Sequence, residues 1–479
     1  MKKSASRIAL IVLAFGLFAA PRSRAQIQLL AAGTLDQSRA GSFADLSGLT
    51  YALENGVPAN SLGGFGSAIC YASGNTFLAL PDRGPNAVPY DSNIDDTDSY
   101  INRFHTVTMD LEPNTTGTGL PFTLTPTLRA TTLLWSLTPL VYGAGDTIVG
   151  SGAPRINNFF VHFFTGRSDN FDPHHNSGDP NDARFDSEGM RLSNDGLRVY
   201  ISDEYGPYVY EFDRFLGVRL RSFQLPPSFY VTNLSSMGAV EISGNTSGRV
   251  ANKGMEGLAI TPDGRTLVGI VQNALIQDAA EGGAAANLLR IVTIDIPSGK
   301  VTHQFGYNLT TGSGVSEILA INNHEFLVDE RDGKGREANG IPPGLSTKAK
   351  ANQSKILYKI DLDGAFDISN SDGLTAAANA VPKTPFLDVA GALIASGIPA
   401  DQVPSKIEGL AFGPDVKDGT TTLHTLWIAN DNDFIQQVLD SSGNLILNPN
   451  QFFVFGFADS DLGGSEFVPQ KITGPRFGW

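Results

Sequence analysis

A short phrase repeats along this chain and limits the folds that it can adopt. Glu-Gly followed by an apolar residue stands at Glu188–Met190, Glu256–Leu258 and Glu408–Leu410. Ser316–Ile318 is a looser copy, and Ser47–Leu49 resembles a degenerate first one. Each copy opens a few apolar residues, usually a turn, and then an apolar segment that ends in an acid or an amide. Self-similarity at this period predicts an array of small sheets.

The spacing of the phrase counts the repeats. The intervals from Glu188 to Glu256 and from Glu256 to Glu317 are similar in length, and the interval to Glu408 is lengthened by an insertion rich in Gly, Pro and Lys. The segment from Ser47 to Glu188 is long enough for two units, one of which has lost its phrase. Repeats are therefore expected to begin near positions 47, 118, 188, 256, 317 and 408.

Turn signals such as Asn194–Gly196 and Pro262–Gly264 separate apolar segments, which predicts hairpins and an all-β fold. A β-propeller typically has four to eight four-stranded blades. We therefore predict a six-bladed β-propeller over residues 26–479, with seven blades as the alternative. An open solenoid is disfavoured because parallel solenoids have much shorter repeats. Residues Gln26–Leu46 precede the first phrase and are expected to supply a strand that closes the last blade.

The N-terminal segment, residues 1–25, has the pattern of a secretory signal peptide. Lys2, Lys3 and Arg7 precede an apolar run at Ile8–Ala20, and a small-x-small cleavage site follows at Ser23–Ala25. We expect cleavage after Ala25 and a secreted protein, periplasmic or extracellular, although a retained membrane anchor is the alternative. No later stretch is apolar enough to span a bilayer, so no stable membrane insertion is expected.

Charge and cysteine content exclude several classes of function. The formal charge of −15 becomes −20 when the signal, with its five basic residues and no acidic one, is removed. Such a protein is not expected to bind nucleic acid or anionic membranes, but carboxylates suit hard divalent cations. The single cysteine, Cys70, cannot form an internal disulfide and lies in an apolar context typical of a core residue.

Acidic and amide residues recur at two places in each repeat. The phrase opens one strand, and the next strand ends at one of five pairs: Asp82-Arg83, Asp203-Glu204, Gln272-Asn273, Asp329-Glu330 and Asn430-Asp431. A hairpin brings both places to one end of its blade, and the inner ends of all blades meet at the mouth of the central channel. Clustered carboxylates repel one another, which raises their pKa values, and a bound calcium ion removes this electrostatic repulsion. The predicted calcium ligands are Glu188, Asp203, Glu204, Glu256, Glu317, Asp329, Glu408 and Asp431. The alternative is a structural turn in which each Glu caps backbone amides.

Basic residues also stand at predicted blade ends. Arg83, Lys253 and Arg331 could bind an anionic substrate, since guanidinium and ammonium groups recognise phosphates and carboxylates. Together with Glu188 and Glu256 they are the candidate catalytic residues. The alternative is that each cation forms a salt bridge with a neighbouring acid.

Two polar loops could each be either a binding site or a solvated loop. Residues 168–188 hold His174 and His175 among many oxygen ligands, and they form either a metal or substrate loop at the mouth or a solvated loop. Residues 91–98 resemble the first half of an EF-hand but lack its glycine at position six and its glutamate at position twelve. They form either a weak surface calcium site or a solvated loop.

Several catalytic motifs are absent. The chain has no G-x-S-x-G, no H-E-x-x-H and no C-x-x-C. It also has no P-loop lysine motif and no dinucleotide-binding glycine fingerprint. A nucleophile-elbow serine hydrolase and zinc-protease or zinc-finger sites are therefore disfavoured. What remains is metal chemistry with oxygen ligands, or binding alone.

A resemblance to a known family is carried by four stretches: FTGRSDNFDPHH to YVYEFDR at 164–214, NKGMEGLAITPDGRTLVGIVQNAL at 252–275, SEILAINNHEFLVDERDGKG at 316–335, and KIEGLAFGPD with LWIANDNDF between 406 and 434. Over roughly residues 47–434 the chain resembles the phytase-like, "esterase-like activity of phytase" family of exported proteins. The resemblance implies a β-propeller and hydrolysis of phosphoesters or esters. The Glu-Gly strand starts are also similar to those of calcium-dependent lactonase propellers, but Met190, Leu258 and Leu410 stand where that family usually has Pro.

The leading hypothesis is a secreted, calcium-dependent hydrolase of phosphate esters or related esters. The expected partner is a small anionic ester, and the expected state is a monomer. The alternatives are a calcium-stabilised binding propeller without turnover and a calcium-dependent lactonase.

Overall fold

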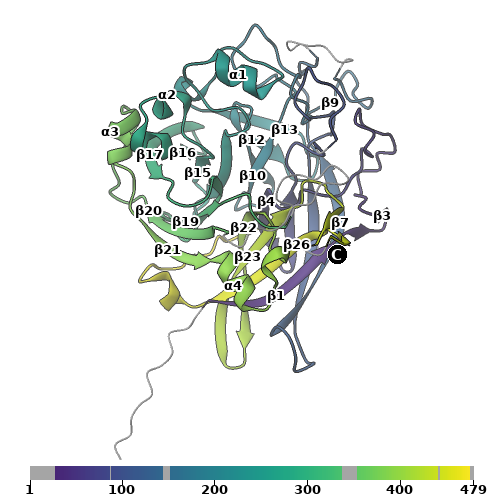
Figure 1. Ribbon diagram of the computed structural model, residues 1–479, viewed down its shortest axis with the longest axis vertical. Helices are drawn as coiled ribbons and strands as arrows, with labels where there is room; N and C mark the ends of the chain where they lie inside the picture. Colours follow the sequence, from purple (N-terminus) through teal and green to yellow (C-terminus); the bar gives the residue numbers. More distant parts are fainter. Residues whose placement is uncertain (1–26, 87, 144–151, 337–352, 441–442, 475–479) are drawn as a thin grey trace, which may run out of the picture.

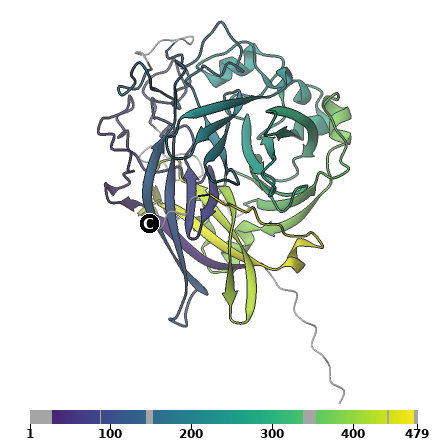
Figure 2. The same cartoon turned by 180° about the vertical axis from the view of Figure 1, so that it is seen from behind.

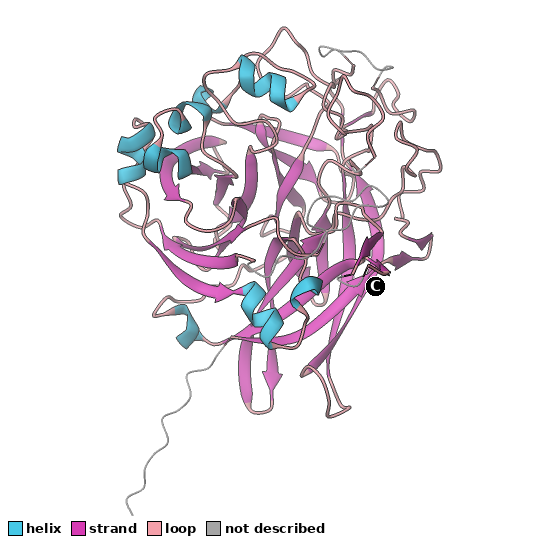
Figure 3. Ribbon diagram, in the orientation of Figure 1, coloured by secondary structure: helices cyan, strands magenta, loops and turns pink. Residues whose placement is uncertain are grey.

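Strands are the main regular structure, loops of varied length join them, and helices are few and short (Figures 1 and 3). A computed structural model describes residues 27–86, 88–143, 152–336, 353–440 and 443–474. The predicted signal peptide and most of the predicted insertion at 335–352 lie outside the described residues. No helix in the described part of the chain is long and apolar enough to cross a membrane.

Five antiparallel sheets of four strands each form the body of the protein. In four of them the strands follow the chain order. The first blade holds β4 (Ala68–Ser73), β5 (Thr76–Leu80), β6 (Arg103–Pro113) and β7 (Phe122–Leu133), and the second holds β10 (Ser187–Leu192), β11 (Arg198–Asp203), β12 (Tyr208–Asp213) and β13 (Arg219–Gln224). The third blade holds β14 (Met255–Ile260), β15 (Thr266–Val271), β16 (Leu288–Asp295) and β17 (Lys300–Asn308), and the fourth holds β18 (Gly314–Ala320), β19 (Glu325–Arg331), β20 (Lys355–Asp361) and β21 (Lys383–Asp388). The innermost strands are β4, β10, β14 and β18 in these four sheets and β22 (Lys406–Asp418) in the fifth. Each of them contacts the innermost strand of the next sheet, and β22 contacts β4, so the ring closes and the fold is a five-bladed β-propeller (Figure 1).

The fifth blade joins the two ends of the chain. Its strand order is β1 (Gln28–Leu35), β26 (Asn450–Phe457), β23 (Thr421–Asp431) and β22 (Lys406–Asp418). Strand β1 pairs antiparallel with β26 along its whole length, from Gln28 opposite Gly456 to Leu35 opposite Asn450. The prediction that residues 26–46 supply a closing strand is confirmed. This ladder between distant segments ties the ring shut.

The remaining elements are short and lie between or beside the blades. The strands are β2 (Gln37–Ser38), β3 (Gly41–Ser42), β8 (Trp135–Ser136), β9 (His162–Phe163), β24 (Gln437–Leu439) and β25 (Leu445–Leu447). The helices are η1 (Pro227–Phe229), α1 (Gly238–Gly244), α2 (Ile276–Ala279), η2 (Gly283–Asn287), α3 (Gly373–Ala378), α4 (Val389–Ala395), η3 (Ala400–Gln402) and η4 (Asp459–Leu462).

The predicted count of six or seven blades is wrong. Ser47–Leu49 precedes β4 and belongs to none of the four-stranded sheets, and residue 118 lies in the turn between β6 and β7. The segment from Ser47 to Glu188, predicted to hold two repeats, holds one blade together with loops before β4 and after β7. The residues that the sequence analysis assigned to an extra blade between Ser47 and Glu188 therefore form long loops.

The glycine of the phrase marks the places where inner strands approach most closely. A Cβ on Gly189 would lie 2.6 Å from the backbone nitrogen of Leu258 in the next blade. A Cβ on Gly257 would lie 2.8 Å from that of Ile318, and one on Gly409 would lie 3.0 Å from the first blade. The pairing of each of these inner strands also shifts at the phrase, as in a β-bulge. A bulge re-aims the side chain at that point.

Apolar side chains fill the spaces between neighbouring blades. Met190, Ile201 and Tyr210 of the second blade, for example, belong to one buried cluster with Leu78 and Leu80 of the first. Each fully buried aliphatic side chain contributes roughly 1.5–3 kcal/mol of transfer free energy. Cys70 lies in the same cluster, which confirms its expected place in the core.

Candidate functional site

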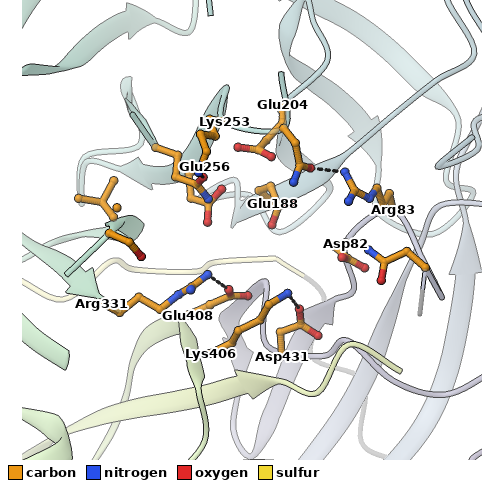
Figure 4. A pocket seen from close by; sticks show the side chains of 16 residues that line it. Asp82, Arg83, Glu188, Glu204, Lys253, Glu256, Arg331, Lys406, Glu408 and Asp431 are labelled. Carbon is orange, nitrogen blue, oxygen red and sulfur yellow. Dashed lines mark hydrogen bonds and ion pairs between the residues drawn. The ribbon is translucent and has the colours of Figure 1, made fainter. Parts of the chain in front are cut away.

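A polar cavity of about 210 Å³ occupies one end of the ring, where inner strands begin and their neighbours end (Figure 4). All five blades contribute to it through residues on or beside their strands. Its lining includes six carboxyl groups and four cationic groups, namely Asp82, Glu188, Glu204, Glu256, Glu408 and Asp431 with Arg83, Lys253, Arg331 and Lys406. We call it the mouth cavity. It holds most of the charged residues that the sequence analysis singled out.

The second and third blades form an acidic half of the mouth cavity. Glu188 and Glu256 stand in the bulges of β10 and β14, and Glu204 directly follows β11. None of the three forms an ion pair with any residue in the described ranges. Burial raises the pKa of Glu188 well above its usual range, and the neighbouring Glu256 and Asp186 raise it further. The pKa of Glu204 is raised by burial and then by Glu256.

Carboxylate oxygens converge in this acidic half, and two of them lack hydrogen-bond partners among the described residues. One carboxylate oxygen from each of Asp186, Glu188 and Glu204 lies within 4.8 Å of the other two, and all three residues are buried. Oε1 of Glu204 and Oε2 of Glu256 accept no hydrogen bond from the residues that the structure describes. Buried oxygens without partners are costly. Carboxylate oxygens are the ligands that calcium prefers, so this donor set fits a calcium ion.

The fifth blade and the end of β19 form a paired half of the cavity. Arg331 donates to Glu408 and, through Nε, to Oγ of Ser316 at 2.7 Å. Lys406 donates to Asp431 at 2.8 Å and also to Asp433. Burial raises the pKa of Glu408 to about 8, and Arg331 only partly opposes that shift. Burial also raises the pKa of Asp431, but the Lys406 ammonium outweighs it, and the net pKa is lowered.

Two further cations lie at the edge of the acidic half. Arg83 donates to Asp186 at 3.1 Å and to Asn252, while its Nε has no hydrogen-bond partner among the described residues. Nζ of Lys253 donates to Gln272 at 3.3 Å. The cations expected at blade ends, Arg83, Lys253 and Arg331, are thus all brought to the same cavity. Their positions beside a carboxylate cluster would let a metal and an anion bind together.

Asp203 and Asp329 were predicted as ligands, but they do not line the mouth cavity. Asp203 is buried and accepts the backbone N–H groups of Asp186, Tyr205 and Gly206 at 2.9–3.0 Å. It stabilises the turn that presents Glu204, and burial raises its pKa to about 8. Asp329 lies inside the fourth blade, where neither carboxylate oxygen has a hydrogen-bond partner among the described residues.

Glu317 was matched to the wrong position of the phrase. The pairing of β18 with β19 shifts between Val315 and Glu317, so the bulge holds Ser316. Ser316 therefore takes the place of the phrase glutamate, and Glu317 takes the place of the glycine. Its carboxylate accepts the N–H groups of Leu258 and Ile318 at 3.0 Å and pairs with Arg191 at 2.9 Å. For this residue the structural alternative holds, because the side chain turns away from the cavity.

Replacing Glu317 by Gln should destabilise the protein without weakening calcium binding. The change leaves the buried Arg191 guanidinium without its counter-ion, which costs about 3–5 kcal/mol. For a chain of this size that corresponds to a fall in melting temperature of about 3–5 °C. Thermal unfolding at pH 8 gives the shift, and calorimetric titration with calcium gives the affinity. An unchanged melting temperature would contradict the assigned role of the pair.

Sequence reasoning missed part of the site. Lys406 lies two residues before Glu408, Asp186 lies two residues before Glu188, and Asp433 lies two residues after Asp431. Asp186 and Asp433 lie just outside β10 and β23, and a bulge separates Lys406 from Glu408. The only signal in the sequence was therefore that charged residues cluster near the phrase and near the strand ends. Asp82 was noted at a strand end but was not included among the predicted ligands. Burial raises its pKa well above the usual range, and Asp431 adds to the shift.

Most of the two polar loops lies away from the mouth cavity, which only the end of the longer loop, at Glu188, reaches. Asp172, His175 and Asp179 form a second cluster, in which only His175 is exposed and lies 2.5 Å from the half-buried Asp179. Asp95 and Asp98 instead accept the backbone N–H groups of Gly238 and Tyr100. These contacts favour a structural role for the loop at 91–98.

Comparisons with known proteins identify a family for most of the chain. The family model Phytase-like, "Esterase-like activity of phytase", matches residues 60–434. An uncharacterized secreted protein of Arthroderma benhamiae is 28% identical over 313 residues, and the match covers 55% of this chain and 60% of that protein. The chain thus spans less than two thirds of the length of that relative.

Solved structures resemble the chain only distantly. The hydrazine synthase of Kuenenia stuttgartiensis is 13% identical, with 77% of this chain and 78% of that chain covered and a TM-score of 0.29. A luciferin-regenerating enzyme is 10% identical, with 86% and 96% covered and a TM-score of 0.30. Neither likeness carries an argument about function. The family model, by contrast, covers most of the chain, and the protein belongs to the phytase-like, "esterase-like activity of phytase", family.

Proposed function

We propose that this protein is an exported, calcium-dependent hydrolase of phosphate esters or related esters, with its active site in the mouth cavity. The observation that supports the proposal is that one cavity holds both an acidic half and a half that contains cations. Buried, unpaired carboxylates of Glu188, Glu204 and Glu256 stand opposite the cations Arg331 and Lys406. The first half suits a metal ion, and the cations suit the anionic group of a substrate.

Calcium would be held by the acidic half, with Asp186, Glu188 and Glu204 as ligands and Glu256 close by. An ion there would offset the repulsion that raises the pKa of these groups. When bound, it would polarise the ester and favour formation of hydroxide from water. It would also offset a local negative field that otherwise repels an anionic ester from an exported protein of formal charge −20.

The protein's own groups would bind and protonate the substrate. In this proposal Arg331 and Lys253 bind the anionic group of the ester, and Arg83 contributes its unpartnered Nε–H. Burial raises the pKa of Glu408, which makes this carboxyl the candidate general acid for the leaving oxygen once the substrate anion has taken over its partner Arg331. Glu256 orients the attacking water through its unpartnered Oε2.

The proposal extends to export and partners. The signal peptide, residues 1–25, is removed on export, and the protein acts as a monomer outside the cytoplasm. Its partner is a small anionic ester, with no role for nucleic acid or for insertion into a membrane. The similarity to a secreted protein and the family match support this reading. N-terminal sequencing of the exported protein should begin at Gln26.

The direct test is turnover of three substrates with calcium and with chelator. The purified protein is assayed with p-nitrophenyl phosphate, p-nitrophenyl acetate and a simple γ-lactone. Calcium-dependent hydrolysis of the phosphate or acetate ester supports the proposal. Turnover of the lactone alone would identify a lactonase. Calcium binding without turnover of any of them would identify a binding propeller.

Replacing Lys253 by Met should raise KM for an anionic ester about tenfold and leave KM for a neutral ester unchanged. Met keeps the length of the side chain but removes the charge, and a tenfold loss corresponds to about 1.4 kcal/mol, close to the lower end of the range for a hydrogen bond to a charged group. The matched control is Lys300→Met, since Lys300 is exposed at the start of β17, away from the cavity. Equal effects on both esters would exclude a role of Lys253 in anion binding.

A further inference from the structure

A segment after the last strand crosses one end of the ring (Figure 2). We call residues 466–474 the strap. Val468 donates its backbone N–H to Ile321 of the fourth blade at 2.9 Å. The Gln470 side chain then donates to the carbonyl of Leu192 and to Oδ1 of Asn194 in the second blade, both at 2.7 Å. The strap therefore bridges two blades that are not neighbours in the ring.

The partners of the strap fix which end of the ring it covers. Leu192 is the last residue of β10, and Ile321 directly follows β18. The mouth cavity, by contrast, is lined where those strands begin, at Glu188 and Gly314. The strap and the mouth cavity thus lie at opposite ends of the inner strands.

A second cavity of about 90 Å³ lies beneath the strap. Its walls include Cys70, Ile260, Leu319 and Leu410 from the inner strands of different blades, and Pro469 and Gln470 of the strap line it from the other side. It shares no lining residue with the mouth cavity.

A polar layer lies between the two ends. The Arg191 guanidinium donates to the carbonyls of Ile69 and Ile318, in the first and fourth blades, at 3.1 and 2.9 Å. It also pairs with Glu317 at 2.9 Å. Its Nε has no hydrogen-bond partner among the described residues, and the side chain borders the second cavity. The second cavity is therefore reached from the strap side.

The strap lies on the surface and not in the core. No residue from Gly463 to Gly474 is buried. Besides its hydrogen bonds, the strap has two apolar anchors. The ring of Phe467 packs against Phe412, with centroids 4.8 Å apart, and against Phe457 and His424. Ile472 packs, partly buried, against the core cluster of the first and second blades. Two glycines with positive φ, Gly463 at 67° and Gly464 at 105°, precede it. Such glycines can absorb a change of chain direction that other residues resist.

We propose that the strap is a lid that opens about Gly463–Gly464 while the propeller stays folded. When it opens, the second cavity becomes accessible, and with it the free Nε–H of Arg191 and the thiol of Cys70. Cys70 is the only cysteine of the chain, and it is buried in the closed state. Its reaction with a thiol reagent therefore reports opening at one defined place. The proposal is independent of the hydrolase activity.

The test measures two rates in the full chain at pH 8. One is the reaction of Cys70 with 5,5′-dithiobis(2-nitrobenzoic acid), and the other is tryptic cleavage after Lys471, within the strap. Gln470→Ala removes the two hydrogen bonds of the Gln470 side chain to the second blade, while Thr473 still donates its backbone N–H and its hydroxyl to the carbonyl of Asn194. The variant should raise both rates at least about tenfold. The melting temperature should change by no more than about 1 °C, because Gln470 is not a core residue.

The matched control is Gln28→Ala, which removes a single side-chain hydrogen bond of 3.2 Å, to Asp418, at the exposed edge of the fifth blade. It should change neither rate. Faster cleavage at Lys471 without faster labelling of Cys70 would show that the strap does not cover the cavity, and would overturn the proposal. Unchanged rates in Gln470→Ala would overturn it as well. A rise in labelling that matches a fall in melting temperature would assign the exposure to global unfolding, against an independent lid.

Discussion

Replacing Glu188 by Gln should lower kcat/KM for the hydrolysed ester by at least about tenfold, or roughly 1.4 kcal/mol of transition-state stabilisation. Glu188 stands at the centre of the acidic half, within 4.8 Å of the ligand oxygens of Asp186 and Glu204. Gln keeps the size of the side chain and removes its charge, so calcium affinity falls while the fold remains. The measurement is steady-state kinetics at saturating calcium, with calorimetric titration of calcium on the same samples.

The control for that variant is Glu112→Gln, since Glu112 is an exposed residue near the end of β6, far along the chain from the phrase. It should retain full activity and calcium affinity. Equal losses in the two variants would indicate a general effect of removing negative charge. Full activity in Glu188→Gln, in a protein with measurable turnover, would move the chemistry out of the acidic half.

Calcium should raise the melting temperature, and a chelator should lower it. An ion that binds only the folded state adds about 2.7 kcal/mol of stability at a hundredfold excess over Kd. For a propeller of this length that is a rise of about 3 °C. Differential scanning calorimetry with calcium and with EDTA measures it, and Glu188→Gln should lose most of the effect. Equal melting temperatures with and without calcium would contradict the proposed site.

The stabilisation by calcium should also grow as the pH rises from 5 to 8. The carboxyl groups of Glu188 and Glu204 have raised pKa values in the folded, metal-free protein. The folded state therefore binds more protons than the unfolded state above their usual pKa, and metal-free stability falls as pH increases through that window. Calcium binds the ionised carboxylates, so it must displace these protons at low pH but not at high pH. The gain in stability on calcium binding is therefore larger at pH 8 than at pH 5. A calcium effect that is larger at pH 5 than at pH 8 would argue against binding by these carboxylates.

The repeated phrase predicted the propeller because it reflects a real packing constraint. Gly189, Gly257 and Gly409 stand where neighbouring inner strands come too close for a side chain. That constraint recurs at contacts between blades and so leaves a trace in the sequence. Loop length follows no such rule, and the long segment before Glu188 therefore led to a prediction of one blade too many.

Within the site, sequence alone could identify the residue types but could not decide where each side chain points. Glu188, Glu256 and Glu408 were placed correctly at one end of the ring because each occupies a bulge. Glu317 differs by one position, and in a strand a shift of one residue turns the side chain to the other face. Ion pairs such as Lys406 with Asp431 depend on the tertiary structure, which the phrase does not encode.

The central claim is that the acidic half of the mouth cavity binds calcium. A crystal structure of the protein grown with calcium, with the ion identified by its anomalous scattering, tests it most directly. The account predicts an ion with carboxylate oxygens of Asp186, Glu188 and Glu204 at about 2.3–2.6 Å. An acidic half that holds only water at millimolar calcium would contradict it.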